Sequence, residues 1–219
     1  GKGASWGNPM SEIYLEAVRY FASSTRSATT AFNADDSAYI SGLTKDTDWT
    51  LPISSTNACA SLNAIVFNAS VSSYDDDQTA TSSAGLATTT SGAALTKAVG
   101  DGESITGNSF FVGKNGTDNN EFCTAKSISG SNGLGDAYGI CPDAPTVRGS
   151  YHMSGLAHWA HTNDISSTLS GRQTLRTFAV SLQTSTPVIR VPVGGNKFVS
   201  ILPAYRLRAR GNNANESSN

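Results

Sequence analysis

The chain has 219 residues, which is enough for one large domain or two small ones. Only 38% of the residues are hydrophobic and 15% are charged, whereas Ser and Thr make up about a quarter of the chain. The apolar runs are far shorter than the roughly 20 residues that a membrane-spanning helix needs. A net charge of −2 with scattered Lys and Arg argues against a nucleic-acid-binding surface. A polar composition of this kind is common in secreted and cell-surface proteins.

The first predicted element is a helix over residues 9–22. Asn8 suits the N-cap, and Pro9 suits the first helical position. Apolar side chains then recur at the spacing of one helical face, at Met10, Ile13, Tyr14, Ala17, Val18 and Phe21.

A short apolar run, Ala64–Asn68, has the length of a strand that is buried on both faces of a parallel sheet. A polar loop with three consecutive acids, Asp75, Asp76 and Asp77, follows it. Weak helical character appears around Ala93–Val99. The Gly-rich region 100–149 is predicted to be an irregular, loop-rich insertion.

A second helix is predicted to begin at Ser150, which can cap it, and to end near Asn163. The run Thr174–Leu182 is predicted to be a strand. Two further strand-like runs, Val188–Val191 and Lys197–Leu202, flank Gly-Gly-Asn and predict a C-terminal β-hairpin. The order helix, strand, helix, strand is typical of an α/β sandwich with a parallel sheet.

The chain has three cysteines. Cys123 and Cys141 lie in one Gly-rich stretch without metal-binding spacing, so we prefer a disulfide between them to two free thiols. Cys59 has two open interpretations: a buried thiol that acts as a small hydrophobe, or a thiol whose partner lies in a part of the parent protein that is absent here.

Several segments in this order resemble one family: the von Willebrand factor A-like region of the PilY/PilC proteins, the large adhesins at the tips of bacterial type IV pili. The similarity covers roughly residues 6–203. It rests on five segments, Trp6–Phe21, Ala64–Asp77, Cys141–Pro145, Gly149–Ile165 and Gln173–Leu182.

The resemblance implies a Rossmann-like, three-layer α/β sandwich over residues 1–203 that lacks its first strand. The polar composition of the end of the chain predicts a flexible tail over residues 204–219. In A-type domains the absent strand bears Asp-x-Ser-x-Ser, which supplies ligands to an adhesion-site metal. Asp164-Ile165-Ser166-Ser167-Thr168 is the nearest match, but it follows a helix. Removal of a central strand would leave the strands at 64–68 and 177–182 with unpaired backbone groups.

A standard adhesion site is not expected, because Asn8 and Asn68 stand where A domains have Thr and Asp. The one metal hypothesis that we retain is Ca²⁺ at Asp75 and Asp77 in the acidic loop, with no other cofactor. Acidic runs in loops are more often solvated than ligating. The chain is not predicted to require a divalent metal tightly.

The resemblance implies a non-enzymatic protein that is exported through the periplasm, stays extracellular or on the cell surface, and works in pilus biogenesis and surface adhesion. Its expected partners are minor pilins or other pilus subunits, a host or abiotic surface, and missing parts of the parent polypeptide, without nucleic acid or a membrane span. The first alternative is a structural subunit of an extracellular filament or complex that completes its sheet with a partner strand. The second alternative, a secreted hydrolase, has only composition in its favour.

Overall fold

The computed structural model describes residues 7–22, 48–80, 86–182, 189–195 and 197–201. Its elements follow the chain as three helices, seven strands and one 3₁₀ turn within these ranges. The predicted polar tail over residues 204–219 lies outside the described residues. None of the helices in the described ranges is long and apolar enough to cross a bilayer.

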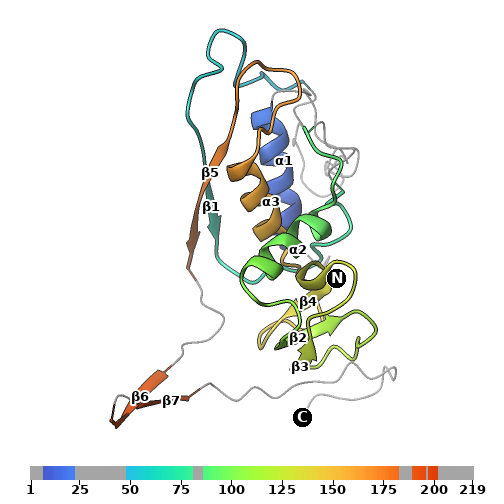
Figure 1. Cartoon of the computed structure of the whole chain (residues 1–219), viewed down its shortest axis with the longest axis vertical. Helices are drawn as coiled ribbons and strands as arrows, with labels where there is room; N and C mark the ends of the chain where they lie inside the picture. Colours follow the sequence, from blue (N-terminus) through green and yellow to red (C-terminus); the bar gives the residue numbers. More distant parts are fainter. Residues whose placement is uncertain (1–6, 23–47, 81–85, 183–188, 196, 202–219) are drawn as a thin grey trace, which may run out of the picture.

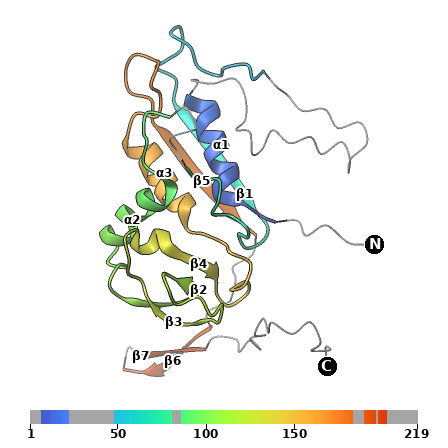
Figure 2. The same cartoon turned by 90° about the vertical axis from the view of Figure 1, so that its right-hand side faces the viewer.

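A parallel pair of strands and two helices form the first part of the fold. Strand β1 (Leu62–Asn68) pairs with β5 (Leu175–Ser181) in parallel, from Leu62 opposite Leu175 to Asn68 opposite Ser181. Helices α1 (Met10–Ala22) and α3 (His152–Thr162) lie on one side of this pair (Figures 1 and 2). The α/β prediction with parallel strands is therefore confirmed at this level.

The first helix forms as its apolar spacing predicts. Tyr14, Leu15 and Val18 are buried in the core between the helices and the strand pair. The Tyr14 hydroxyl lies 2.7 Å from Thr177 Oγ1, which ties α1 to β5. On α3, Leu156 enters the same core.

The second part of the fold corrects the expectation of an irregular insertion at 100–149. An antiparallel sheet in the order β3-β2-β4 lies there, built from β2 (Ser109–Asn115), β3 (Thr124–Ser127) and β4 (Ala137–Ile140). A 3₁₀ turn, η3 (Gly133–Asp136), precedes β4. The two outer strands have only four residues each and include Gly, Lys and Ser, so no apolar alternation marks them in the sequence.

Helix α2 (Gly92–Gly102) joins the two parts of the fold. Ser91 caps it by accepting a hydrogen bond from Ala94 N at 3.3 Å. Gly155 of α3 lies against the backbone and hydroxyl of Thr96, so a Cβ at this position would be under 3.0 Å from them. This close approach requires a residue without a side chain.

The C-terminal hairpin predicted from Gly-Gly-Asn is confirmed, with β6 (Ile189–Gly194) antiparallel to β7 (Lys197–Ile201). The von Willebrand factor A-like, three-layer arrangement stays a prediction. A three-layer sandwich has helices on both faces of its sheet. In the described part of the chain, β1 and β5 form a sheet of two strands with helices on one face.

Candidate functional site

The predicted acidic loop after β1 folds onto the start of α1. Asp75 is completely buried, and its Oδ1 accepts hydrogen bonds from the backbone amides of Ser11 at 2.6 Å and Glu12 at 3.3 Å. Its Oδ2 accepts from the Ser11 hydroxyl at 2.7 Å and lies 3.1 Å from the Ser150 hydroxyl. A carboxylate at this place satisfies the free amides of a helix N-terminus and opposes the positive end of its dipole.

The same network reaches the start of α3. Ser11 Oγ accepts from the amide of Met153 at 2.9 Å, and Ser150 Oγ accepts from the amide of His152 at 3.2 Å. Burial raises the pKa of Asp75, and the hydrogen bonds from Ser11 oppose that shift. Asp75 therefore joins the N-termini of two helices.

The other acids of the loop have different surroundings. Asp77 is exposed, and its carboxylate is one of the groups that raise the pKa of the buried Glu12. Burial, together with Asp77 and Asp75, raises the pKa of Glu12 to about 7, although a hydrogen bond from the Gln78 amide lowers it. No group of three or more His, Cys, Asp or Glu side chains in the described ranges is arranged to hold a metal. Ca²⁺ at Asp75 and Asp77 stays a prediction.

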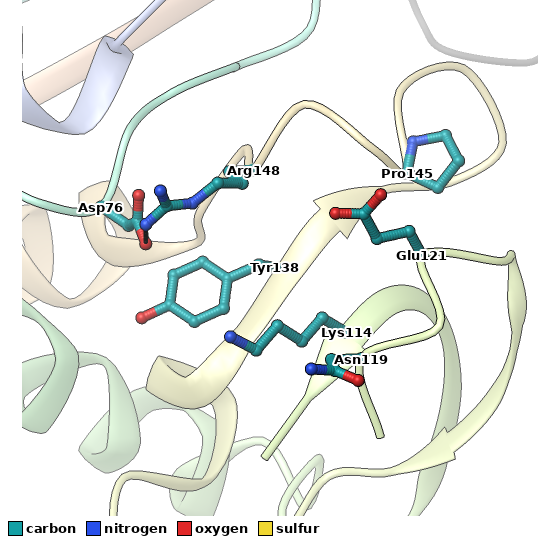
Figure 3. A pocket seen from close by; sticks show the side chains of 7 residues that line it. All are labelled: Asp76, Lys114, Asn119, Glu121, Tyr138, Pro145 and Arg148. Carbon is teal, nitrogen blue, oxygen red and sulfur yellow. Dashed lines mark hydrogen bonds and ion pairs between the residues drawn. The ribbon is translucent and has the colours of Figure 1, made fainter. Parts of the chain in front are cut away.

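A small charged cleft of about 120 Å³ lies between the acidic loop and the antiparallel sheet (Figure 3). Arg148 Nη2 donates to Asp76 Oδ2 at 2.6 Å, which raises the pKa of Arg148. Lys114 Nζ lies 5.6 Å from the centre of the Tyr138 ring. The cleft is lined by Asp76, Lys114, Asn119, Glu121, Tyr138, Pro145 and Arg148.

The cleft can bind a polar group but contains no activated nucleophile. Burial is the main cause that raises the pKa of Tyr138 to about 12, so its phenol stays protonated. The cations of Lys114 and Arg148 are balanced by Asp76 and Glu121, which leaves the lining formally neutral. A hydroxyl–imidazole pair does exist nearby, because Thr79 Oγ1 lies 2.8 Å from His152 Nδ1.

That pair has a structural role. Thr79 and His152 are both buried, and the other ring nitrogen of His152 lies 2.9 Å from the carbonyl of Gly135. A substrate cannot reach the imidazole without displacing the turn that covers it. His152 therefore holds the start of α3 against both η3 and the segment that contains Thr79.

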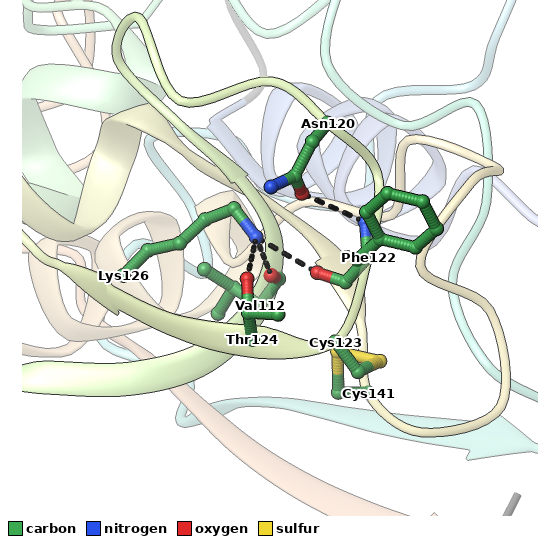
Figure 4. Close-up of a disulfide and its surroundings, with 7 residues drawn as sticks. All are labelled: Val112, Asn120, Phe122, Cys123, Thr124, Lys126 and Cys141. Atoms are coloured by element: carbon green, nitrogen blue, oxygen red, sulfur yellow. Dashed lines mark hydrogen bonds between the residues drawn. A yellow bond between two sulfur atoms is a disulfide. The ribbon is translucent and has the colours of Figure 1, made fainter. Parts of the chain in front are cut away.

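The structure joins Cys123 and Cys141 in a disulfide with a Cα–Cα distance of 5.7 Å (Figure 4). Cys123 precedes β3 and Cys141 follows β4, so the bond links the two outer strands of the sheet across β2. Cys59 is a free, exposed thiol, which makes its interpretation as a buried hydrophobe wrong.

A buried lysine lies beside the disulfide (Figure 4). Lys126 Nζ donates to the carbonyls of Val112 at 2.9 Å and Phe122 at 2.7 Å and to Thr124 Oγ1 at 2.8 Å. Burial lowers the pKa of Lys126. These bonds anchor the segment before β3 to the central strand.

The most unusual surface is the second face of the β1–β5 pair. Ile65 is 75% exposed, although the sequence predicted a strand that is buried on both faces. Residues that pair across parallel strands lie on the same face, so Ile65 with Phe178 and Phe67 with Val180 form one apolar surface. We call Ile65, Phe67, Phe178 and Val180 the open face.

Sequence reasoning missed both the open face and the cleft. The amino-acid sequence of an apolar strand such as β1 is the same whether its second face is covered or exposed. The exposure of that face depends on whether another element packs on it, which the strand's own sequence does not encode. The cleft residues come from β2, β4 and three loops far apart in the chain, so no local sequence pattern marks them.

Comparison with known proteins gives the family. Residues 1–160, well over half of the chain, match the family described as "PilY1 homolog, second domain". A protein of Xylella fastidiosa (strain Temecula1 / ATCC 700964) named "Type IV pilus biogenesis factor PilY1 homolog" is 26% identical over 90% of the chain. The aligned part is 14% of that protein's length. No solved structure matches the chain. The chain therefore belongs to the family of PilY1 homologues and contains the region that this family describes as their second domain.

Proposed function

We propose that the chain is a non-enzymatic module of a type IV pilus biogenesis factor and that it works by binding other polypeptide segments through the open face. The single observation that carries this proposal is the exposure of large apolar side chains on β1 and β5, at Ile65, Phe67, Phe178 and Val180. Contiguous apolar surface of this kind marks interaction sites. The pilus-related name of the Xylella fastidiosa relative supports the biological setting.

The partners that we propose are minor pilins or other pilus subunits, together with the rest of a longer parent polypeptide. A host or abiotic surface is the corresponding target for an adhesive role. The chain spans 14% of the length of the Xylella fastidiosa relative. We therefore propose, for this chain, only a part in the activity and the partners of a whole pilus factor. The Cys123–Cys141 disulfide supports an exported, periplasmic or extracellular location, because such bonds persist in oxidising compartments.

The finer fold proposal is a von Willebrand factor A-like core made of α1, β1, α3 and β5. Its support is the parallel pairing of β1 with β5 and the helices on one face. The second candidate function is a structural subunit whose sheet is completed by a partner strand. It is favoured by one observation: in the described part of the chain β1 and β5 form a sheet of only two strands.

A catalytic role has less support. The hydroxyl–imidazole pair of Thr79 and His152 is buried, and the charged cleft holds no nucleophile beside a base. A secreted hydrolase would need both groups to reach a substrate.

The test is pilus formation in the bacterium that makes the protein. Ile65→Ser combined with Phe178→Ser removes apolar area from the open face, and we expect fewer surface pili in a sheared-pilin immunoblot at equal protein level. The control is Phe111→Ser, which removes an equally exposed aromatic ring from β2. Normal pilus number in the double variant, or the same loss in the control, would reject the proposal.

A further inference from the structure

We propose that the occupant of the open face is a single amphipathic α-helix from a polypeptide segment outside this chain, with its C-terminal end at Arg176. This inference rests on the proposed function, because it names the kind of partner that the open face accepts.

The shape of the open face fits one helix. Parallel strands lie about 4.8 Å apart, so the two strands of this pair present a surface about as wide as one helix, which is about 10 Å across with its side chains. The seven residues of β1 span about 23 Å, which a helix of about 15 residues matches. Parallel sheets are covered by helices on both faces, and here α1 and α3 cover only one.

The chemistry of the open face also favours a helix stripe. Ile65 lies opposite Phe178, and Phe67 lies opposite Val180, so the apolar side chains form two adjacent cross-strand pairs. A helix presents apolar residues at i, i+3, i+4 and i+7 along one line, which matches an apolar strip of this shape. An exposed aliphatic side chain at Leu182 extends the strip beyond the end of β5.

Charge gives the direction. Arg176 is exposed two residues before Phe178 on β5 and therefore lies on the same face. It also lines a shallow hollow of about 160 Å³ at the start of the strands, together with Arg172, whose guanidinium donates to the carbonyl of Thr162 at the end of α3. No acidic residue lines this hollow or belongs to the open face.

A helix C-terminus has free carbonyls and the negative end of the dipole, so it is stabilised next to a cation. The docked helix therefore runs antiparallel to β1 and β5, with its last turn at Arg176.

The experiment is site-specific photo-cross-linking in the bacterium that makes the protein. The photoreactive amino acid p-benzoylphenylalanine replaces Ile65 or Phe178, and the matched control carries it at Phe111, an exposed ring on a different sheet. Mass spectrometry of the cross-linked peptides identifies the contacted segment. We expect both open-face positions to cross-link to one segment outside this chain with apolar residues at i, i+3, i+4 and i+7, and to contact the same part of it, because Ile65 and Phe178 lie opposite each other.

Charge reversal tests the direction independently. Arg176→Glu is expected to lower the cross-link yield at position 178 about two- to fivefold, and Arg176→Lys is expected to retain it. Equal yields for the two variants would overturn the orientation.

Four results would overturn the helix itself. The first is a contacted segment with strictly alternating apolar residues, which indicates a strand. The second and third are a contact to β1 or β5 of a second copy and a contact within this chain. The fourth is a cross-link yield at positions 65 and 178 that is no higher than the yield at position 111. The cross-link and the pilus count can also give different answers. If the contacted segment is helical but Ile65→Ser with Phe178→Ser leaves the pilus number unchanged, the docked helix is supported and only the pilus function is rejected.

Discussion

The carboxylate of Asp75 binds both the amide and the hydroxyl of Ser11, at 2.6 and 2.7 Å, although 64 residues separate them in the chain. The loop after β1 thereby provides the cap of α1. Because the same carboxylate contacts Ser150 at 3.1 Å, one side chain holds the starts of two helices beside the end of a strand.

Asp75→Ala should lower the free energy of unfolding by about 2–4 kcal/mol, because it leaves the buried amide and hydroxyl of Ser11 without their acceptor. Urea titration followed by circular dichroism measures the change. The control, Glu103→Ala, alters an exposed carboxylate at the end of α2 and should stay within about 0.5 kcal/mol. Equal effects of the two substitutions would contradict the capping role.

The pKa of Glu12 predicts a pH dependence of stability. Burial raises this pKa from 4.5 to about 7, so between these values the folded protein holds a proton that the unfolded chain has lost. The free energy of unfolding should therefore fall as the pH rises from about 4.5 to 7. Burial also raises the pKa of Asp75. Titration of Asp75 should therefore also lower the free energy of unfolding as the pH rises, beginning at a lower pH than for Glu12.

Glu12→Gln removes the titrating group and should flatten the slope between pH 5 and 7 in denaturant titrations. Glu103→Gln, on an exposed carboxyl at the end of α2, is the matched control and should leave the slope unchanged. A slope that survives Glu12→Gln would show that another group titrates in this window.

The disulfide should stabilise the antiparallel sheet more than the β1–β5 core. It closes a loop with a sequence separation of 18, which corresponds to about 3 kcal/mol in the chain-entropy model. Cys123→Ser with Cys141→Ser should therefore speed amide exchange in β2, β3 and β4 first. Cys59→Ser, at an exposed thiol, should change nothing. Alkylation of both Cys123 and Cys141 in the native, unreduced protein would reject the bond.

The contact between α2 and α3 should be sensitive to a single methyl group. Gly155→Ala would place a Cβ under 3.0 Å from the backbone and hydroxyl of Thr96, which forces the helices apart. We expect a loss of about 1–3 kcal/mol in thermal or urea unfolding. Gly102→Ala, in the last turn of α2, meets nothing within 4 Å and should be neutral or slightly stabilising. Equal stability of the two variants would contradict the close packing.

The sequence predicted the elements whose signals are local. The helix with apolar spacing from Met10 to Phe21, the strands predicted at 64–68 and 174–182 and the Gly-Gly hairpin all have a signal within a few residues. The antiparallel sheet lacked such a signal, because its short outer strands are fixed by pairing with β2, by the disulfide and by Lys126.

The sites depended on long-range contacts that no local pattern encodes. Asp75 looked like a member of a solvated acidic run, but the fold buries it as a helix cap and leaves Asp77 at the surface. The burial of β1 on one face only also could not be predicted, since Ile65 and Phe67 have the same residue types as core positions.

The central claim is that another polypeptide element covers the β1–β5 pair. Its most direct test is amide hydrogen exchange at residues 64–68 and 177–182, in residues 1–219 expressed alone and in the protein isolated from piliated cells. We predict fast exchange at these positions in the chain alone and strong protection in the protein from piliated cells. Slow exchange in a monodisperse monomer of residues 1–219 would contradict the claim and show that this chain covers its own sheet.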